Sequence, residues 1–502
     1  MARLKTAGAL ALICALDFGL LATASAEIFT FRTEPLLGTE VNVTISAPSQ
    51  SEAERIHTVM LDEITRLDGI LSTWRTDTEI SALNRGETIQ LSQETSDVLK
   101  LCENYRDKFP DGFSCNIGEI IDLWRIAKEE GFLPNLDEVR ALQTLASASK
   151  TVNLDAEGTG TKPTGVSLNL DSIAKGYIID RAVEAGIETS SAGTTLQDTG
   201  ILLNVGGDIR VSGVLGPEYR NIGIASVGAA DNTPPVEILS LKNAAIATSG
   251  NGTRDLEIGN RQFSHIISPK TGRPQEKTSQ VTVIAPTAAE ADALATAFSV
   301  VGVSQSLLHA NNQPGVEAMI ITSGGARFTS SGWSALAAPT IKKTAEEVGI
   351  ENPFPTDFEL AIDYEFERKN VPEYEYPYIV MWITSPDRKL VRPLMMLGNQ
   401  PRWVEENYVF WRRYGRKSPA MVETLSRPTK APGQYRMVWD GYDQSGAPVP
   451  QGEYTLHIEA SREHGDHQYL KRTFSFETEI FEDLFEQGDE LGQIEIHYGP
   501  KS

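Results

Sequence analysis

The sequence has 502 residues, which predicts two to four domains if a domain has about 100–200 residues. Hydrophobic residues make up 40% of the chain and charged residues 23%, the balance of a globular protein with a sizeable core. The net charge of -23 argues against nucleic acid as a partner, because phosphate backbones bind positive surfaces, and it disfavours anionic membranes.

The first 26 residues have the three parts of a cleavable export signal. Residues 3–5 supply basic charge, residues 7–21 are mostly apolar, and residues 24–26 form a small-residue cleavage site. The apolar run is too short for a stable membrane span. We therefore expect a periplasmic protein whose mature chain begins near Glu27.

Removal of this signal takes Cys14 with it and leaves Cys102 and Cys115 as the remaining thiols. An oxidising compartment allows the two to pair. Two cysteines do not define a disulfide framework, so the paired and the free state both stay open.

Residues 27–339 mix strand and helix patterns without one regular alternation. Helical periods cover residues 51–71, 171–185 and 290–301, and alternating or apolar runs such as EVNVTISA and QVTVIAP indicate strands. We therefore predict an α+β domain with two layers, in which a sheet packs on helices, and not a doubly wound parallel sheet.

The remaining chain divides into a joint and a second domain. Residues 340–375 are acidic and contain proline, and we interpret them as a linker with room for one strand. Residues 376–502 hold short strand patterns that are separated by turn signals at regular spacing. That spacing predicts a small all-β, immunoglobulin-like sandwich, which we interpret as an accessory domain.

Five motifs between residues 171 and 296 carry the side chains that suggest chemistry. They are DSIAKGYIID from Asp171, NVGGDI from Asn204, ATSGN from Ala247, HIISPKTG from His265 and DALAT from Asp292. Each also has an ordinary structural interpretation, such as a tight turn at the glycines or a structural histidine. The sequence lacks a Walker A motif, a G-x-G-x-x-G fingerprint and zinc-ligand spacing.

Together these motifs fit a magnesium-assisted nucleotide site. Asp292 and Thr296 are four residues apart on a predicted helix, so both oxygens lie on one face and suit a hard cation such as Mg²⁺. The glycines of NVGGDI and the TSG of ATSGN offer backbone N–H groups that a pyrophosphate can approach closely. His265 precedes a Pro- and Gly-containing turn that would aim its ring.

The order of these motifs resembles the ApbE family of FAD:protein FMN transferases. LLGTEVNVTI and DGFSCNIGEIIDLW resemble two further segments of that family, and the resemblance covers about residues 29–335. Two positions depart from the family pattern. Leu37 replaces the usual methionine, a swap that conserves volume, and Cys115 stands where an aspartate is common.

The resemblance implies a set of site residues. Asp292, Thr296 and the backbone carbonyl of Ala174 would hold Mg²⁺, and either His265 or Asp292 would act as the base. The residues implied in FAD binding are Leu37, Trp74, Phe113, Ser114, Cys115, Asp171, Lys175, Tyr177, Gly206, Gly207, Ser249, Gly250, His265 and Ile266.

The implied reaction is Mg-dependent transfer of FMN from FAD to a Thr or Ser hydroxyl of an exported or membrane-bound acceptor protein, with release of AMP. Two alternatives stay open, namely an FAD pyrophosphate hydrolase and a periplasmic flavin-binding protein without catalysis. Residues 376–480 resemble a domain of unassigned function found beside such transferases. We interpret it as a docking module, with membrane redox components among its candidate partners.

Overall fold

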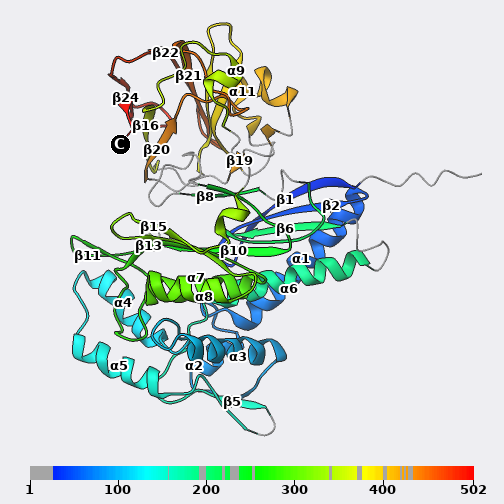
Figure 1. The fold of residues 1–502 in the computed structure, drawn as a ribbon, viewed down its shortest axis with the longest axis vertical. Helices are drawn as coiled ribbons and strands as arrows, with labels where there is room; N and C mark the ends of the chain where they lie inside the picture. Colours follow the sequence, from blue (N-terminus) through cyan, green and yellow to red (C-terminus); the bar gives the residue numbers. More distant parts are fainter. Residues whose placement is uncertain are drawn as a thin grey trace, which may run out of the picture.

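The protein is described here by a computed structural model. It covers residues 26–155, 158–191, 199–216, 221–225, 237–250, 255–337, 342–369, 376–398, 404–418, 421–422, 426–427 and 433–501. The predicted export signal lies outside these residues, apart from Ala26. Among the described helices, none is long and apolar enough to cross a membrane. Figure 1 shows a helix-and-sheet body in the N-terminal part and a strand-rich body in the C-terminal part.

An eight-stranded antiparallel sheet forms the centre of the N-terminal domain. Its strands, in order across the sheet, are β1 (Glu27–Leu36), β2 (Thr39–Ala47), β6 (Gly200–Val205), β7 (Asp208–Gly213), β10 (Ala244–Gly250), β13 (Thr278–Ala285), β14 (Glu317–Thr322) and β15 (Arg327–Thr329). In β2, Val41, Val43 and Ile45 are buried and the residues between them are half-buried. This period of two is the one expected for a strand with one face on a core.

Helices cover one face of this sheet (Figure 1). They are α1 (Gln50–Leu71), α6 (Ala174–Ser191), α7 (Ala288–Val301) and α8 (Val303–Asn312). The buried residues of α1 recur every three or four positions, from Ala53 to Leu71. Helix α7 is buried nearly all round because it lies between α6 and strands β10 and β13. The prediction of a two-layer α+β domain is therefore confirmed.

Smaller elements extend both sides of this core. Beyond the helix layer lie α2 (Glu79–Asn84), α3 (Gln93–Lys108), α4 (Gly118–Glu130) and α5 (Leu136–Ala148), with the short strands β3 (Ile89–Gln90), β4 (Asn153–Leu154) and β5 (Thr159–Thr161). The other face of the sheet packs on Leu239 and Trp333. They belong to the ribbon of β8 (Asn221–Ile224) and β9 (Glu237–Ser240) and to the turn η2 (Trp333–Leu336).

The C-terminal domain consists of two antiparallel sheets around one core. One sheet has the order β20 (Gly433–Trp439), β16 (Phe358–Phe366), β24 (Ile494–Pro500) and β23 (Phe481–Phe485). The other has the order β19 (Ser426–Arg427), β18 (Leu390–Leu397), β17 (Tyr378–Thr384), β21 (Gly452–Ser461) and β22 (His467–Phe476), with β19 parallel to its neighbour. The prediction of an all-β C-terminal domain is confirmed.

The predicted linker of residues 340–375 instead contains part of this sandwich. Strand β16 lies between β20 and β24, and its residues Leu360, Ile362, Tyr364 and Phe366 are buried in the sandwich core. A short helix, α9 (Ala345–Val348), precedes it. The acidic residues of β16 alternate with these apolar ones, so composition indicated a linker where the alternation indicates a strand.

Candidate functional site

Helices α6 and α7 meet at their N-terminal ends, and this contact places the predicted metal residues. A Cβ on Gly176 would lie 2.4 Å from the carbonyl oxygen of Ala288, so glycine is needed for the close approach. The carboxylate of Asp180 accepts hydrogen bonds from the N–H groups of Ala288 and Ala289 at 2.8 and 2.9 Å. Asp180 thereby fixes the start of α7 on α6, in the manner of a helix cap.

Asp292 lies on α7 beside this contact, and its surroundings are unusual for a carboxylate. It is buried, and its Oδ2 has no hydrogen-bond partner among the described residues. Burial raises the pKa of Asp292 to about 7, and the negative charge of Asp208 adds to the rise, against the opposing effects of Lys175 and the Gly176 N–H. A buried oxygen with an unused lone pair and a neighbouring carboxylate is the environment expected where a cation binds.

Lys175 and Asp208 form the polar wall of this site. The Nζ of Lys175 lies 2.7 Å from Oδ2 of Asp208, and both side chains are largely buried. Asp171 also adds negative potential at Asp292. The sequence analysis gave no role to Asp180 and Asp208, although each lies in one of the five motifs. Neither spacing nor residue type reveals a contact between distant segments.

The two other predicted metal residues lie on the same helices. Thr296 is half-buried one turn after Asp292 on α7, and Ala174 is the buried first residue of α6. The described residues hold no group of three or more His, Cys, Asp or Glu that would suit a metal. The predicted metal ligands are one carboxylate, one hydroxyl and one backbone carbonyl, so they do not form a group of this type.

Gly206 and Gly207 form the tight turn between β6 and β7. Their φ values of 59° and 97° are those of a two-residue hairpin that requires glycine. The Gly206 N–H donates to the Glu40 carbonyl at 3.0 Å, and the Gly207 N–H donates to Oδ1 of Asn204 at 2.9 Å. In this structure the first N–H group donates to β2 and the second donates within the β6–β7 turn, and their use by a pyrophosphate stays a prediction. The turn also places Asp208 at the start of β7.

His265 follows the hairpin of β11 (Leu256–Ile258) and β12 (Arg261–Phe263). Its Nδ1 lies 3.1 Å from Oδ1 of Asp255, and its backbone N–H donates to the same oxygen at 3.2 Å. A carboxylate on Nδ1 leaves Nε2 as the proton acceptor of a neutral ring. Asp255 was not predicted, because nothing in its spacing from His265 distinguishes it. Ile266, the next residue, is buried.

Four of the residues implied in FAD binding, Trp74 and the segment from Phe113 to Cys115, differ in how exposed they are. Trp74 is 71% exposed, and its neighbour Thr73 donates to Asp171 through their side-chain oxygens at 3.3 Å. Phe113 is buried and Ser114 is half-buried. Cys115 is buried and forms a disulfide with Cys102, with 5.8 Å between the Cα atoms. The open question of their pairing is thus answered, and Cys115 offers no free thiol to the pocket.

The remaining residues implied in FAD binding lie in a turn, at the end of a strand and in the first turn of a helix. Leu37 lies in the turn between β1 and β2 with a φ of 54° and packs on the main core. Ser249 and Gly250 end β10, and the residues that follow them lie outside the described ranges. Tyr177 lies on α6 near Asp97 and Arg181, a different charge environment from that of Lys175.

Both parts of the chain match known proteins. The ApbE family model matches residues 37–320, more than half of the chain, and a model described as "Predicted periplasmic protein (DUF2271)" matches residues 359–493. A FAD:protein FMN transferase of Treponema pallidum is 26% identical and covers 58% of this chain and 83% of its own length. One from Chlamydia muridarum is 31% identical, covering 51% of this chain and 78% of its own.

Solved structures give the same fold for the N-terminal domain. The ApbE protein of Thermotoga maritima aligns with a TM-score of 0.55 and 25% identity, over 62% of this chain and 100% of its own. The flavin transferase ApbE of Vibrio cholerae aligns with a TM-score of 0.51 at 23% identity, over 62% of this chain and 99% of its own. A region that matches the DUF2271 model follows the N-terminal domain, and the chain belongs to the ApbE family.

Proposed function

We propose that this protein transfers FMN from FAD to a Thr or Ser hydroxyl of an exported or membrane-bound acceptor protein and releases AMP. The observation that carries the proposal is the buried Asp292, whose Oδ2 has no partner among the described residues and whose neighbours are Lys175 and Asp208. A passive flavin-binding pocket has no need of such a costly buried carboxylate. Relatives that bear the name FAD:protein FMN transferase support the same reaction.

The residues present fit Mg²⁺ as the metal. Asp292, the Thr296 hydroxyl and the Ala174 carbonyl are hard oxygen donors, and so small a set leaves positions for phosphate oxygens and water. Bound there, Mg²⁺ would neutralise charge on the FAD pyrophosphate as the bond to AMP breaks. Lys175, held by Asp208, adds fixed positive charge beside the same phosphates.

His265 is the proposed base. Asp255 holds its Nδ1, so Nε2 accepts the proton of the acceptor hydroxyl. The hydroxyl oxygen forms a bond to the phosphorus on the FMN side, and the bond from that phosphorus to the bridging oxygen breaks. AMP leaves with that oxygen and its electron pair. The acceptor then carries FMN through a phosphoester.

We further propose that residues 1–26 direct export to the periplasm. The Cys102–Cys115 disulfide supports an oxidising compartment, where such bonds persist. N-terminal sequencing of the exported protein should find a chain that starts near Glu27, and material that still starts at Met1 would contradict the signal.

One reaction mixture tests the main proposal. The purified protein is incubated with FAD, Mg²⁺ and a Thr-containing acceptor, and both the acceptor mass and the nucleotides are measured. Flavin transfer predicts flavinylated acceptor and AMP in equal amounts. Free FMN and AMP with an unmodified acceptor would indicate a hydrolase, and unchanged FAD would indicate a binding protein.

A further inference from the structure

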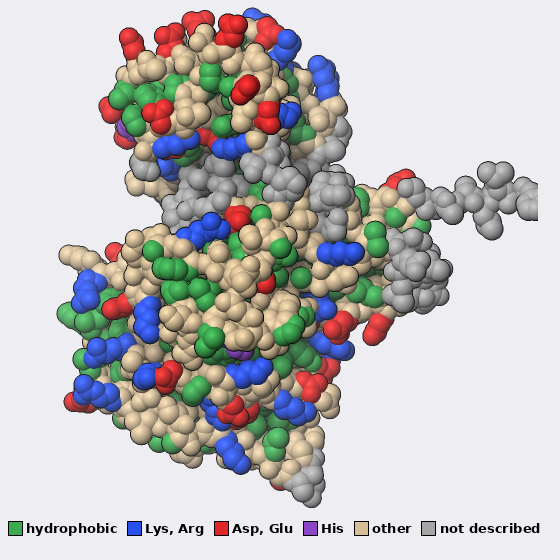
Figure 2. Space-filling model, in the orientation of Figure 1, with side chains coloured by type: hydrophobic (Ala, Val, Ile, Leu, Met, Phe, Trp, Pro, Cys, Tyr) green, Lys and Arg blue, Asp and Glu red, His purple; other side chains and the backbone are tan. Residues whose placement is uncertain are grey.

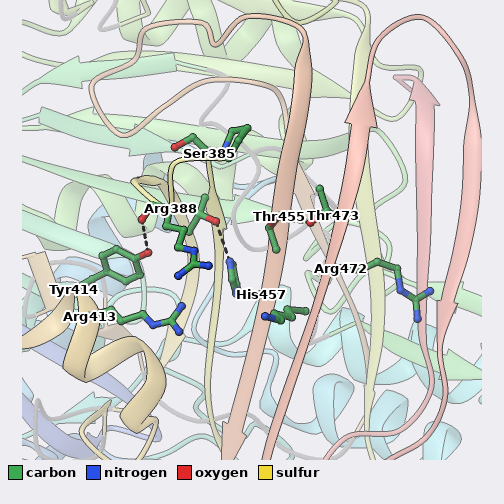
Figure 3. Close-up of a pocket in the computed structure, with 11 residues that line it drawn as sticks. Ser385, Arg388, Arg413, Tyr414, Thr455, His457, Arg472 and Thr473 are labelled. Carbon is green, nitrogen blue, oxygen red and sulfur yellow. Dashed lines mark hydrogen bonds between the residues drawn. The ribbon is translucent and has the colours of Figure 1, made fainter.

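A second cavity lies in the C-terminal domain, far in sequence from the flavin site. It has a volume of about 290 Å³, near the lower end for small-molecule sites. Its walls come from the end of β17, from the turn after β17, from β21 and β22, and from α11 (Tyr408–Arg413) with the residue after it. Figure 3 shows Arg388, Arg413 and His457 directed toward one space from three different elements.

Three exposed cations border this cavity, and none of them has a counter-ion among the described residues. The described part of the chain supplies no ion pair and no side-chain hydrogen bond to Arg388, Arg413 or Lys471. Two other arginines of this domain are paired with carboxylates, Arg436 with Asp363 and Arg462 with Glu490. Uncompensated cations are unexpected in a chain of net charge -23, where carboxylates outnumber them. Figure 2 shows acidic side chains over much of the C-terminal domain.

Arg472 also borders the cavity but is not one of this set. Its side chain leaves the opposite face of β22 and pairs with Asp483, and Figure 3 shows it directed away from Arg388 and Arg413. Lys471, in contrast, is the register partner of His457, so both side chains lie on the cavity face of the sheet.

The backbone at Arg388 is strained in a way that favours a role for its side chain. Arg388 has a φ of 61° in the turn between β17 and β18, where glycine or asparagine is the usual residue. The Tyr414 hydroxyl donates to its carbonyl at 2.9 Å and holds the turn against η3 (Gly415–Lys417). An arginine at such a position is expected where the guanidinium is needed.

The cavity floor is rigid and supplies hydroxyl groups. His457 is buried between the Thr384 hydroxyl at 2.9 Å and the Tyr469 hydroxyl at 2.8 Å, and its ring stacks on Trp382 with 4.8 Å between centroids. Thr455 and Thr473 lie side by side with their hydroxyl oxygens 2.8 Å apart. Hydroxyls and cations without carboxylates are the donors that oxyanions require.

We propose that this cavity binds a phosphate-bearing anion through Arg388, Arg413 and Lys471. Three cations exceed what one carboxylate needs and suit a phosphate group, which carries a charge of about −1.5 to −2 as a monoester and offers three acceptor oxygens. Two sources share this chemistry, a free phosphate ester and a phospholipid headgroup. The inference does not depend on flavin transfer, because no residue of the first site takes part.

The first experiment titrates inorganic phosphate and glycerol phosphate, without Mg²⁺, into the full-length protein by calorimetry. Arg413→Gln and Lys471→Gln should each weaken binding at least about tenfold. Lys389→Gln is the control for loss of one positive charge near the cavity, because Lys389 does not line the cavity and is paired with Asp387. Equal affinity in all four proteins would overturn the proposal.

A second experiment separates the two sources. Vesicles of phosphatidylglycerol, with phosphatidylcholine vesicles as the neutral-headgroup control, are sedimented with the wild type and with Arg413→Gln. Loss of sedimentation in the variant supports a lipid headgroup, and phosphate binding without sedimentation supports a free ester. Failure of the wild type to bind phosphate, glycerol phosphate and both vesicles, or binding only to an acidic peptide, would overturn the proposal.

A third variant distinguishes loss of phosphate binding from loss of folding. Arg388→Gly removes a cation and also relieves the backbone strain, so its melting temperature should equal or exceed that of the wild type while phosphate binding is lost. As a further readout, bound phosphate should raise the pKa of His457, which Arg413 and Lys471 help to lower. Undiminished binding by Arg388→Gly, or an unchanged His457 titration at saturating phosphate, would count against the site.

Discussion

At the scale of single residues, Asp292 is the position of the N-terminal domain at which we expect the proposed reaction to tolerate substitution least. Asp292→Asn keeps the shape but removes the buried charge, and we expect flavin transfer to fall by at least about 10²-fold, as when electrostatic stabilisation of phosphate is lost. In the absence of metal, the melting temperature of Asp292→Asn should be no lower than that of the wild type. A buried carboxylate with an unused oxygen is itself destabilising.

The measurements are AMP release, Mg²⁺ binding and thermal unfolding. Glu290→Gln is the matched control, because it removes a carboxylate from the same helix and its charge neighbours are Lys108 and Asp180. This control should keep most of the activity. Full transfer by Asp292→Asn at saturating Mg²⁺ would show that the site has been assigned to the wrong helix face.

His265 and Asp255 should behave as a base and its positioning partner. Removal of the imidazole in His265→Ala should lower kcat by about 10²–10⁴-fold with FAD affinity little changed. Asp255→Asn keeps the ring but loosens its orientation, so we expect a smaller fall in kcat and a shifted pH–rate profile. Single-turnover flavinylation across pH checks both. A wild-type rate in His265→Ala would leave Asp292 as the base.

His457 should make the stability of the C-terminal domain depend on pH. Burial lowers its pKa from 6.5 to about 4, and Arg413 and Lys471 add to the effect. The unfolded chain therefore takes up a proton more readily, and stability is lost as pH falls from about 6.5 to about 4, by at most about 1.4 kcal/mol per pH unit.

The comparison is between unfolding free energies at pH 7 and at pH 4.5. His457→Gln should flatten this pH dependence, because the substituted side chain does not titrate. Equal slopes in the wild type and in His457→Gln would refute the assignment.

At the scale of elements, the Cys102–Cys115 disulfide ties α3 to the segment that precedes α4. It closes a short loop, with a sequence separation of 13, for which the chain-entropy relation gives about 3 kcal/mol of stabilisation. Cys102→Ser with Cys115→Ser should lower the unfolding free energy by an amount of that order. The reduced wild type should match the double variant, and reductant should not change the variant further. No difference between oxidised and reduced wild type would contradict this role.

The elements also show what could be read from the sequence. The helical period over residues 51–71 predicted α1, found at Gln50–Leu71, and the period over 290–301 predicted most of α7, because local patterns report which face is buried. The contact of Asp180 with α7 joins segments that are 108 residues apart, and the contact of Asp255 with His265 spans the β11–β12 hairpin, and neither follows a helix or strand period. Composition indicated a linker with room for one strand over residues 340–375, and β16 is that strand, with a half-buried face that is largely acidic.

At the scale of the whole molecule, the two domains have separate cores. The largest core cluster draws its residues from Val41 to Ile320, and the sandwich cluster draws its residues from Phe354 to Tyr498. The chain between them already belongs to the second body, because Lys342 pairs with Asp440 and the Lys343 N–H donates to the Gly446 carbonyl. The natural place to divide the protein is therefore after Ala337, before these contacts begin.

A shortened chain that ends at Ala337 should bind FAD and Mg²⁺ with the affinity of the full protein and transfer FMN to a short acceptor peptide at the same rate. It should lose efficiency with an intact protein acceptor, because docking by the second domain adds binding energy far from the reacting phosphate. FAD titration and flavinylation rates on both acceptors are the measurements, with thermal unfolding as the check that the shortened chain is folded. Residues 342–502 added separately should not restore the rate, because the tether sets the effective concentration. A folded short chain with much weaker FAD binding would mean that the sandwich contributes to the flavin site.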